Sequence, residues 1–110
     1  FLNNQRIKVS KKKDINECLF AIGENLNKEP DLLSRKSGCA ALDLAYVAAG
    51  RYDGYFQKKL NLWDIASGVL LVQEAGGIIS DIDIRKLKNL NIIASNSNIN
   101  EEFQKKVLNF

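Results

Sequence analysis

One stretch near the middle of the chain, residues 63–77, restricts the possible folds more than any other. Its apolar residues recur at helical spacing, which predicts a helix with one broad buried side formed by Ile65, Ala66, Val69, Leu70, Val72 and Ala75. Gly76 and Gly77 supply the left-handed residue that ends a helix. Asp64 lies where the helix begins, and the helix dipole favours a carboxylate there. Such a carboxylate can serve as a metal ligand, while Trp63 before it is expected to be a packing anchor.

The composition predicts a single folded domain of modest charge. The chain has 110 residues, and 45% of them are hydrophobic, which is enough for a core. Its formal net charge of +3 is far from that of a dedicated nucleic-acid binder. The apolar runs are too short to cross a bilayer. The chain begins at Phe1 and contains no methionine, so we expect it to be part of a longer protein.

The cysteine and histidine counts exclude some kinds of site. There is no histidine, and Cys18 and Cys39 are the two cysteines. A disulfide framework and zinc sites of the Cys/His kind are therefore not expected. Two sparse thiols among apolar neighbours suit a reducing compartment, which predicts a cytoplasmic location. Cys18 is interpreted as a core residue rather than a reactive thiol.

The first fifty residues predict two strands, loops and a helix. Residues 5–10 alternate apolar and polar side chains, and residues 18–22 form a short apolar run typical of a strand covered on both faces. The three lysines at residues 11–13 are interpreted as a solvated loop, since no aromatic residue between them could stack on a base. Residues 24–33 indicate a loop. Residues 34–50 indicate a helix that is entered through Ser37 and Gly38.

The rest of the chain predicts three further strands and two helices, the first of which covers residues 63–77. Residues 51–57 indicate a tight turn into a short strand, and short strands follow at 78–82 and 91–95, joined by a polar connection. Residues 99–110 indicate an amphipathic helix, because apolar side chains recur at Ile99, Phe103, Val107 and Phe110. About five strands and three helices alternate, which predicts an α/β layered domain with a mixed sheet packed against helices.

Two long blocks of the sequence resemble the inositol monophosphatase family, whose members are magnesium-dependent, lithium-sensitive phosphomonoesterases. One block reads Trp-Asp-Ile-Ala-Ser-Gly over residues 63–68 and Glu-Ala-Gly-Gly over 74–77, and the other covers residues 35–56. The similarity covers nearly the whole chain but only the C-terminal half of a family member. It implies that residues 1–110 form one domain, the C-terminal domain of the sugar-phosphatase fold, without the N-terminal metal-binding half.

The resemblance also implies which residues carry the chemistry. Asp64 would bind Mg²⁺ and contact the substrate. The backbone of Gly38, Cys39 and Ala40 would face a sugar or cyclitol, and Gln57 would bond one of its hydroxyls. Two positions depart from the family pattern, because most members have Ser or Thr at Cys39 and many have Glu at Gln57. Backbone amides at a helix start and a side-chain amide can still bond a hydroxyl.

The family places its remaining metal ligands, a Glu and an Asp-Pro-(Ile/Leu)-Asp-Gly-Thr motif, in its N-terminal half, and that motif does not occur in this sequence. One carboxylate cannot hold two or three magnesium ions, so no catalytic residue and no turnover are expected from the chain alone. The implied partners are a small phosphorylated substrate such as an inositol phosphate, the N-terminal half of the same enzyme, and a second copy in a homodimer. Neither a membrane nor a nucleic acid is expected as a partner.

Other functions stay open at the level of sequence. A site built from the candidate carboxylates Asp53, Asp64, Glu74 and Asp81 is not favoured, because helix geometry puts Asp64 and Glu74 about 15 Å apart. The main alternative is a non-catalytic interaction module that keeps the fold and binds a partner through exposed apolar surface. A weaker alternative is nucleic-acid binding through Arg6, Lys8 and the lysines at 11–13. A dinucleotide site is excluded because no G-x-G-x-x-G follows a strand.

Overall fold

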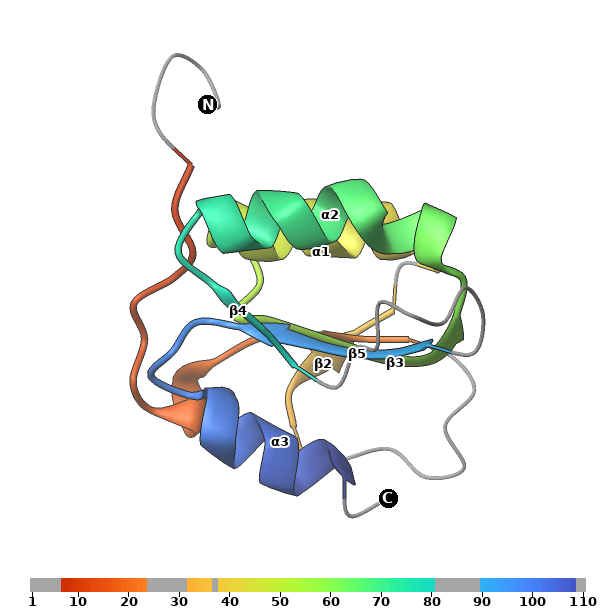
Figure 1. Cartoon of the computed structure of the whole chain (residues 1–110). Helices are drawn as coiled ribbons and strands as arrows, with labels where there is room; N and C mark the ends of the chain where they lie inside the picture. Colours follow the sequence, from red (N-terminus) through yellow and green to blue (C-terminus); the bar gives the residue numbers. More distant parts are fainter. Residues whose placement is uncertain (1–6, 24–31, 37, 81–89, 109–110) are drawn as a thin grey trace.

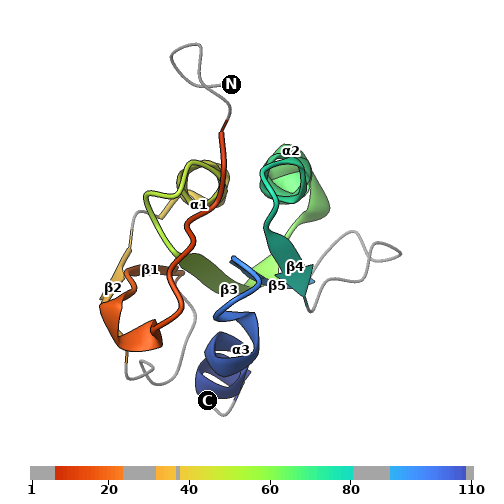
Figure 2. The same ribbon diagram turned by 90° about the vertical axis from the view of Figure 1, so that its left-hand side faces the viewer.

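A computed structural model of the chain describes residues 7–23, 32–36, 38–80 and 90–108. The strands within these ranges are β1 (Phe20–Ile22), β2 (Ser34–Arg35), β3 (Gly54–Leu60), β4 (Ile78–Ser80) and β5 (Leu90–Ser95). The helices are η1, a 3₁₀ turn (Ile15–Glu17), α1 (Ala40–Ala48), α2 (Leu62–Glu74) and α3 (Asn100–Leu108). Helices α1 and α2 cover one face of the sheet and α3 covers the other (Figure 1). Figure 2 shows α1 and α2 side by side across one face.

The described strands form one mixed sheet in the order β2-β1-β3-β5-β4. Strand β1 pairs in parallel with β2 and β3, whereas β5 pairs antiparallel with β3 and β4. This arrangement confirms the predicted α/β class with a mixed five-stranded sheet. Because side chains alternate along a strand, each central strand contributes to both helical layers. Tyr55 of β3 packs with the α1 and α2 residues, while Phe56 next to it packs with those of α3.

Helix α2 forms where the sequence predicts it, but its buried side is narrower than expected. Ile65, Gly68 and Val72 are buried in the helix, and Ala75 is buried directly after it. Ala66 is exposed and Leu70 is 56% exposed, so the prediction that they are buried is wrong. Trp63 is 63% exposed and is not a packing anchor, because it lies on the side of the helix that faces away from the sheet. The helix ends at Gly76, whose φ of 91° is the expected left-handed conformation.

Helix α1 is shorter than the sequence predicts. It begins at Ala40 rather than near residue 34, because Ser34 and Arg35 pair in parallel with Phe20 and Ala21 of β1 as strand β2. A two-residue edge strand carries no periodic signal, which is why the pattern does not distinguish it from the helix. The helix ends before Gly50, whose φ of 77° fits the predicted stop.

The segment before β1 is not the strand that the alternation predicts. Residues 7–10 belong to no strand, and Ile7 and Val9 instead pack on the core beneath α1 and α2. The Val9 N–H donates to the carbonyl of Ala75 at 3.1 Å, so this segment crosses the end of α2. Residues 11–13 form a loop as predicted. The strand predicted over residues 18–22 is confirmed for Phe20–Ile22, which form β1 and are all buried, whereas Leu19 before them is in no strand and is half-buried.

The C-terminal elements largely follow the predictions. Strand β3 extends to Leu60, beyond the predicted strand, and β5 begins at Leu90. Phe103 and Val107 of α3 and Ile99 directly before it are buried, as the spacing predicts. The ring of Phe103 stacks on that of Phe20, with 4.3 Å between the centroids. The predictions for residues 3–6, 24–31, 81–89 and 110, including Arg6, Asp81 and Phe110, lie outside the described residues.

Candidate functional site

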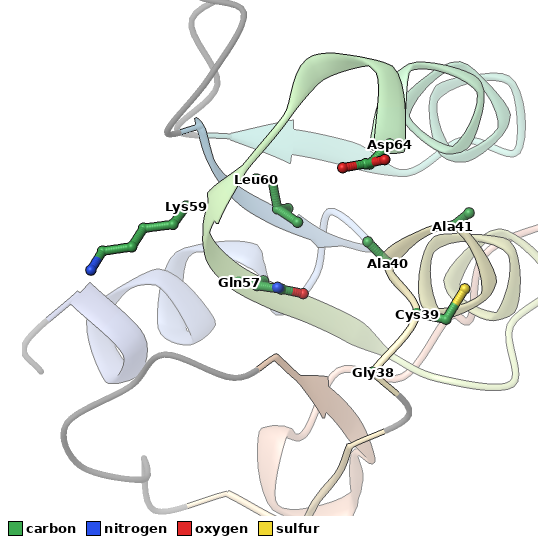
Figure 3. Close-up of a pocket in the computed structure, with 8 residues that line it drawn as sticks. All are labelled: Gly38, Cys39, Ala40, Ala41, Gln57, Lys59, Leu60 and Asp64. Atoms are coloured by element: carbon green, nitrogen blue, oxygen red, sulfur yellow. The ribbon is translucent and has the colours of Figure 1, made fainter.

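A pocket of about 410 Å³ lies where helices α1 and α2 begin, on the side of the sheet that these helices cover. Its lining comes from the segment that enters α1, from the second half of β3 and from the first turn of α2 (Figure 3). The lining residues are Gly38, Cys39, Ala40, Ala41, Gln57, Lys59, Leu60 and Asp64. The fold thus brings together all five residues that the sequence analysis names as a site, from three separate elements.

The α1 side of the pocket is built from backbone. Cys39 is the residue before the helix, with an extended conformation (φ −130°), and its side chain makes no capping bond to the helix. Gly38 before it has a φ of 77°. The first amides of a helix have no partner within the helix and carry a partial positive charge, so they suit an anion or a hydroxyl oxygen. In Figure 3 the Cys39 sulfur points toward Ala41, away from Gln57 and Asp64.

Asp64 contributes the acidic side of the pocket. It lies in the first turn of α2, which Asn61 precedes without a side-chain capping bond, and its N–H donates to the Asn61 carbonyl at 3.1 Å. Its side chain is exposed, so a ligand in the pocket can reach the carboxylate. Figure 3 shows this carboxylate on the opposite side of the opening from Gln57.

The β3 side of the pocket contains an irregularity in the sheet. The pairing of β3 with β5 shifts register between Gln57 and Leu60, and Lys59 there has a φ of 60°. A residue other than glycine in this left-handed region is strained, and bulges of this kind redirect side chains. Gln57 is half-buried and accepts a hydrogen bond through its Oε1 atom from the Tyr55 hydroxyl.

The structure allows a test of whether these residues suit magnesium. Mg²⁺ prefers oxygen ligands, mainly carboxylates, and Asp64 is the one carboxylate that lines the pocket. Within residues 7–23, 32–36, 38–80 and 90–108, no group of three histidine, cysteine, aspartate or glutamate side chains could hold a metal ion. Asp64 therefore fits as a single ligand of a magnesium site whose other ligands come from elsewhere.

The other carboxylates that the structure describes have different environments. Asp53 is buried, and its Oδ2 atom accepts from the Leu19 N–H at 2.8 Å and from Lys12 Nζ at 3.2 Å. The hydrogen bond from Lys12 holds the loop of residues 11–13 next to Asp53, the residue before β3. Glu74 is exposed in the last turn of α2, at the opposite end from Asp64. Neither lines the pocket.

The two cysteines differ in their exposure, and Cys18 is a core residue as predicted. Cys18 is buried, and its Sγ donates to the carbonyl of Asp14 at 3.3 Å. Burial and, next, the negative charge of Asp53 raise the pKa of the Cys18 thiol to about 11, so it stays protonated at neutral pH. Cys39 is exposed beside the pocket.

Sequence reasoning named the site residues but not all of the residues that support them. Tyr55 is fully buried below Gln57, and its role appears only when the strand places the two side chains on the same face. Lys59 and Leu60 line the pocket because of the register shift in β3, for which the sequence has no signal. None of the helices that the structure describes combines the length and the apolar composition that a membrane-spanning helix needs.

Fold and pocket together define a class: a layered α/β domain with a polar pocket at the starts of two adjacent helices. Comparison with known proteins makes the class specific. The sequence model of the inositol monophosphatase family matches residues 1–109. The chain therefore belongs to the inositol monophosphatase family.

Individual relatives carry different names. The Nus factor SuhB of Haemophilus influenzae is 38% identical over 96% of this chain and 46% of its own length. The inositol-1-monophosphatase of Mesorhizobium japonicum is 51% identical over 66% of this chain and 28% of its own. The solved structure of the Thermotoga maritima IMPase has a TM-score of 0.86 and 34% identity, and the match covers 99% of this chain and 47% of that one. The chain thus spans less than half the length of these relatives.

Proposed function

We propose that this chain is the C-terminal part of a magnesium-dependent phosphatase that hydrolyses a small phosphomonoester, such as inositol 1-phosphate, to an alcohol and phosphate. The observation that carries the proposal is the pocket in which the Asp64 carboxylate faces Gln57 and the start of α1. Membership of the inositol monophosphatase family supports the reaction class. Relatives that carry the name inositol-1-monophosphatase support the choice of substrate.

Each side of the pocket has a separate task in this proposal. Asp64 supplies one carboxylate ligand to Mg²⁺, and that metal, when bound, neutralises phosphate charge and activates a water molecule. The backbone of Gly38, Cys39 and Ala40 and the side-chain amide of Gln57 hold the alcohol portion of the substrate. The remaining metal ligands come from the N-terminal half of the enzyme, so the chain alone is expected to be inactive. The single-domain boundary, the cytoplasmic location and the homodimer stay predictions.

Phosphate release from inositol 1-phosphate tests this function. The chain is assayed with Mg²⁺, first alone and then mixed with the N-terminal half of a family member. We expect turnover only in the mixture. Because even the outer-shell partners of a metal ligand are worth about 10- to 100-fold in activity, Asp64→Asn should reduce turnover by more than about 10-fold.

Glu74→Gln is the matched control, since it removes an exposed carboxylate from the other end of the same helix. It should leave turnover unchanged. Turnover by the unmixed chain that survives Asp64→Asn would contradict the assignment of Asp64 and indicate a site elsewhere.

The second candidate is a non-catalytic interaction module. The name Nus factor SuhB, which several similar proteins carry, favours this alternative over a purely enzymatic role. Exposed apolar side chains on α1 and α2, namely Leu42, Trp63 and Leu70, offer surface for a partner. If neither the folded chain alone nor the mixture releases phosphate, this second function is supported and the phosphatase proposal fails.

A further inference from the structure

The segment that precedes η1 crosses the molecule at the end opposite to the pocket. Residues 7–14, here called the strap, pass the ends of α1 and α2, whereas the pocket lies where these helices begin (Figure 1 and Figure 2). A Cβ atom added to Gly50, which follows α1, would lie 3.1 Å from the Lys8 carbonyl oxygen and 3.4 Å from the Ser10 nitrogen. The strap therefore lies directly against the turn that joins α1 to β3.

Hydrogen bonds from two asparagines hold the strap in place. Asn96 is buried, and its Nδ2 atom donates to Ser10 Oγ at 3.0 Å and to the Lys12 carbonyl at 3.1 Å. Asn98 Nδ2 donates to the Lys11 carbonyl at 3.2 Å. Because these bonds reach the lysines only through their backbone, they fix the path of the strap without using an ammonium group.

The strap carries three lysines whose charge is not neutralised nearby. The Lys12 ammonium group pairs with the buried Asp53 carboxylate at 3.2 Å, which also ties the strap to the α1–β3 turn. Lys8, Lys11 and Lys13, here called the strap lysines, are exposed, and none of them forms an ion pair within the part of the chain that the structure describes. These three ammonium groups are therefore open to a negatively charged partner.

Exposed carboxylates lie at the two ends of the strap rather than along its middle. Asp14 ends the strap and Glu17 follows it in η1, while Glu74 lines a second pocket together with Lys8. Arg51, in the turn beside the middle of the strap, adds a further exposed positive charge. The middle of the strap and this turn therefore form the most basic part of this end of the molecule.

The fold also supplies the aromatic side chains that the strap itself lacks. Tyr46 near the end of α1 and Tyr52 after it pack edge-on, with 5.6 Å between the ring centroids. The Arg51 guanidinium group lies over the Tyr46 ring at 5.6 Å. Both rings are half-buried, so they are held by packing and remain partly open to solvent. A planar arginine–tyrosine pair thus lies beside the lysines, although no aromatic residue separates the lysines in the sequence.

We propose that the strap and the α1–β3 turn form a binding surface for single-stranded nucleic acid, in which the strap lysines contact phosphates and Arg51 and Tyr46 stack on a base. Proteins that bind single strands combine positive charge along the backbone with aromatic or guanidinium planes on which bases stack. An acidic peptide would use the lysines equally well, but its carboxylates have no planar ring to stack on Tyr46. None of these residues lines the pocket, so the inference does not rest on the proposed function.

The test is a titration of the chain, without Mg²⁺, against fluorescently labelled oligouridylate and oligothymidylate, followed by fluorescence anisotropy. We expect dissociation constants typical of non-specific binding, about 1 to 100 μM, and weaker binding of a duplex of equal length, whose bases are already stacked. Tighter binding of one of the two strands identifies RNA or DNA as the partner, and either result supports the proposal. Absence of binding, or equal binding of the duplex, would overturn it.

The dependence of binding on salt tests the lysines. For single strands, each phosphate contact contributes about −0.7 to the slope of the logarithm of the binding constant against that of the salt concentration. Lys11→Gln combined with Lys13→Gln should therefore reduce the magnitude of the slope by about 1.4. The matched control is Lys105→Gln combined with Lys106→Gln, which removes the same charge from α3. An equal reduction in the control would show that overall charge rather than this surface binds the strand.

Arg51→Lys separates stacking from charge, because it keeps the positive charge and removes the guanidinium plane. This change and Tyr46→Leu should each weaken the binding of oligouridylate by about five-fold or more, the effect of losing one stacked base. Tyr46→Phe keeps the ring and should bind like the unaltered chain. Since Arg51 is exposed, the result for Arg51→Lys stands even if Tyr46→Leu does not fold.

Oligoglutamate is the probe for the other kind of partner. If oligoglutamate binds as tightly as the oligonucleotides, and neither Arg51→Lys nor Tyr46→Leu weakens the binding of oligouridylate, the surface recognises negative charge alone and the proposal fails. Weaker binding of oligoglutamate that is insensitive to both changes supports the proposal. None of these measurements involves metal or turnover, so their outcome is independent of the phosphatase proposal.

Discussion

At the scale of single residues, Lys59 has a strained backbone conformation and lies beside the pocket. Its φ of 60° coincides with the register shift in β3, and it lines the pocket with Gln57 and Leu60. A side chain other than glycine costs about 1 to 2 kcal/mol in this conformation. The surrounding sheet holds the strained residue because β3 continues to Leu60, which is buried on the far side of the shift.

Lys59→Gly is therefore expected to raise the free energy of unfolding by about 1 kcal/mol, because glycine adopts a positive φ without steric cost. Lys58→Gly, one residue earlier in the same strand, should lower it by about 0.5 to 1 kcal/mol, as glycine does in a strand interior. Urea unfolding of the three proteins measures both differences. A loss of stability in Lys59→Gly would mean that the lysine side chain contributes more than its backbone strain costs.

Cys18 makes stability depend on pH at the alkaline end. Its pKa in the folded protein is about 11, above the ordinary value of 9.0, so the folded state holds the proton more tightly than the unfolded state does. The resulting stability is fully present below pH 9 and is lost as the pH rises to about 11. Cys18→Ala should flatten the decline of the unfolding free energy over this range. Equal profiles for Cys18→Ala and the unaltered chain would contradict this.

At the scale of elements, the pocket depends on how closely α1 and α2 approach each other. A Cβ atom added to Gly68 would lie 2.7 Å from the Cβ and Cδ1 atoms of Leu44, so glycine allows the two helices to touch here. Both helices begin at the pocket, and the contact between them fixes the separation of Asp64 from the start of α1. A small residue in the middle of α2 thereby supports a site at its end.

Gly68→Ala is expected to destabilise the protein by about 1 to 3 kcal/mol through overpacking, although alanine has the higher helix propensity. Ser67→Ala, at the exposed neighbouring position, should be neutral or slightly stabilising. In a Leu44→Ala background the cost of Gly68→Ala should shrink only in part, because Leu44 Cδ1 is removed while its Cβ atom, also 2.7 Å from the added group, remains. Thermal or urea unfolding of these variants measures the difference, and a fully additive cost in the double variant would exclude the contact with Cδ1 as a cause.

At the scale of the whole molecule, one sheet is shared by two helical layers. Residues of β3 and β5 alternate between the core below α1 and α2 and the core above α3, so neither layer has a sheet of its own. Loss of either layer therefore exposes apolar side chains on the same strands. This predicts that the described part of the chain unfolds as one cooperative unit.

Phe103→Ala tests this cooperativity from the α3 side. Removal of a buried phenylalanine that stacks on Phe20 should cost about 3 to 5 kcal/mol. Amide hydrogen exchange should then lose protection by a similar free energy at Leu44 and Val47 of α1, on the opposite layer. Loss of protection in α3 alone would show that the layers open independently. Val72→Ala, in α2, is the reciprocal variant and should lower the protection of α3.

The long elements and the identity of the pocket residues could be predicted from local patterns of residues. Apolar periodicity predicts helices α2 and α3, short apolar runs predict strands β1 and β5, and the family resemblance pointed to Gly38, Cys39, Ala40, Gln57 and Asp64 as one site. These signals are local, because each depends on the spacing of residues within one element or on a contiguous motif.

The segment that supplies the edge strand and the residues that support the site depend on contacts in the folded molecule. Ser34 and Arg35 become β2 because β1 offers an open edge, whereas residues 7–10 cross the end of α2. Trp63 is exposed because it lies on the side of α2 opposite to the buried residues Ile65 and Val72. Contacts of this kind depend on pairing and packing across the sheet, which no local pattern of residues encodes.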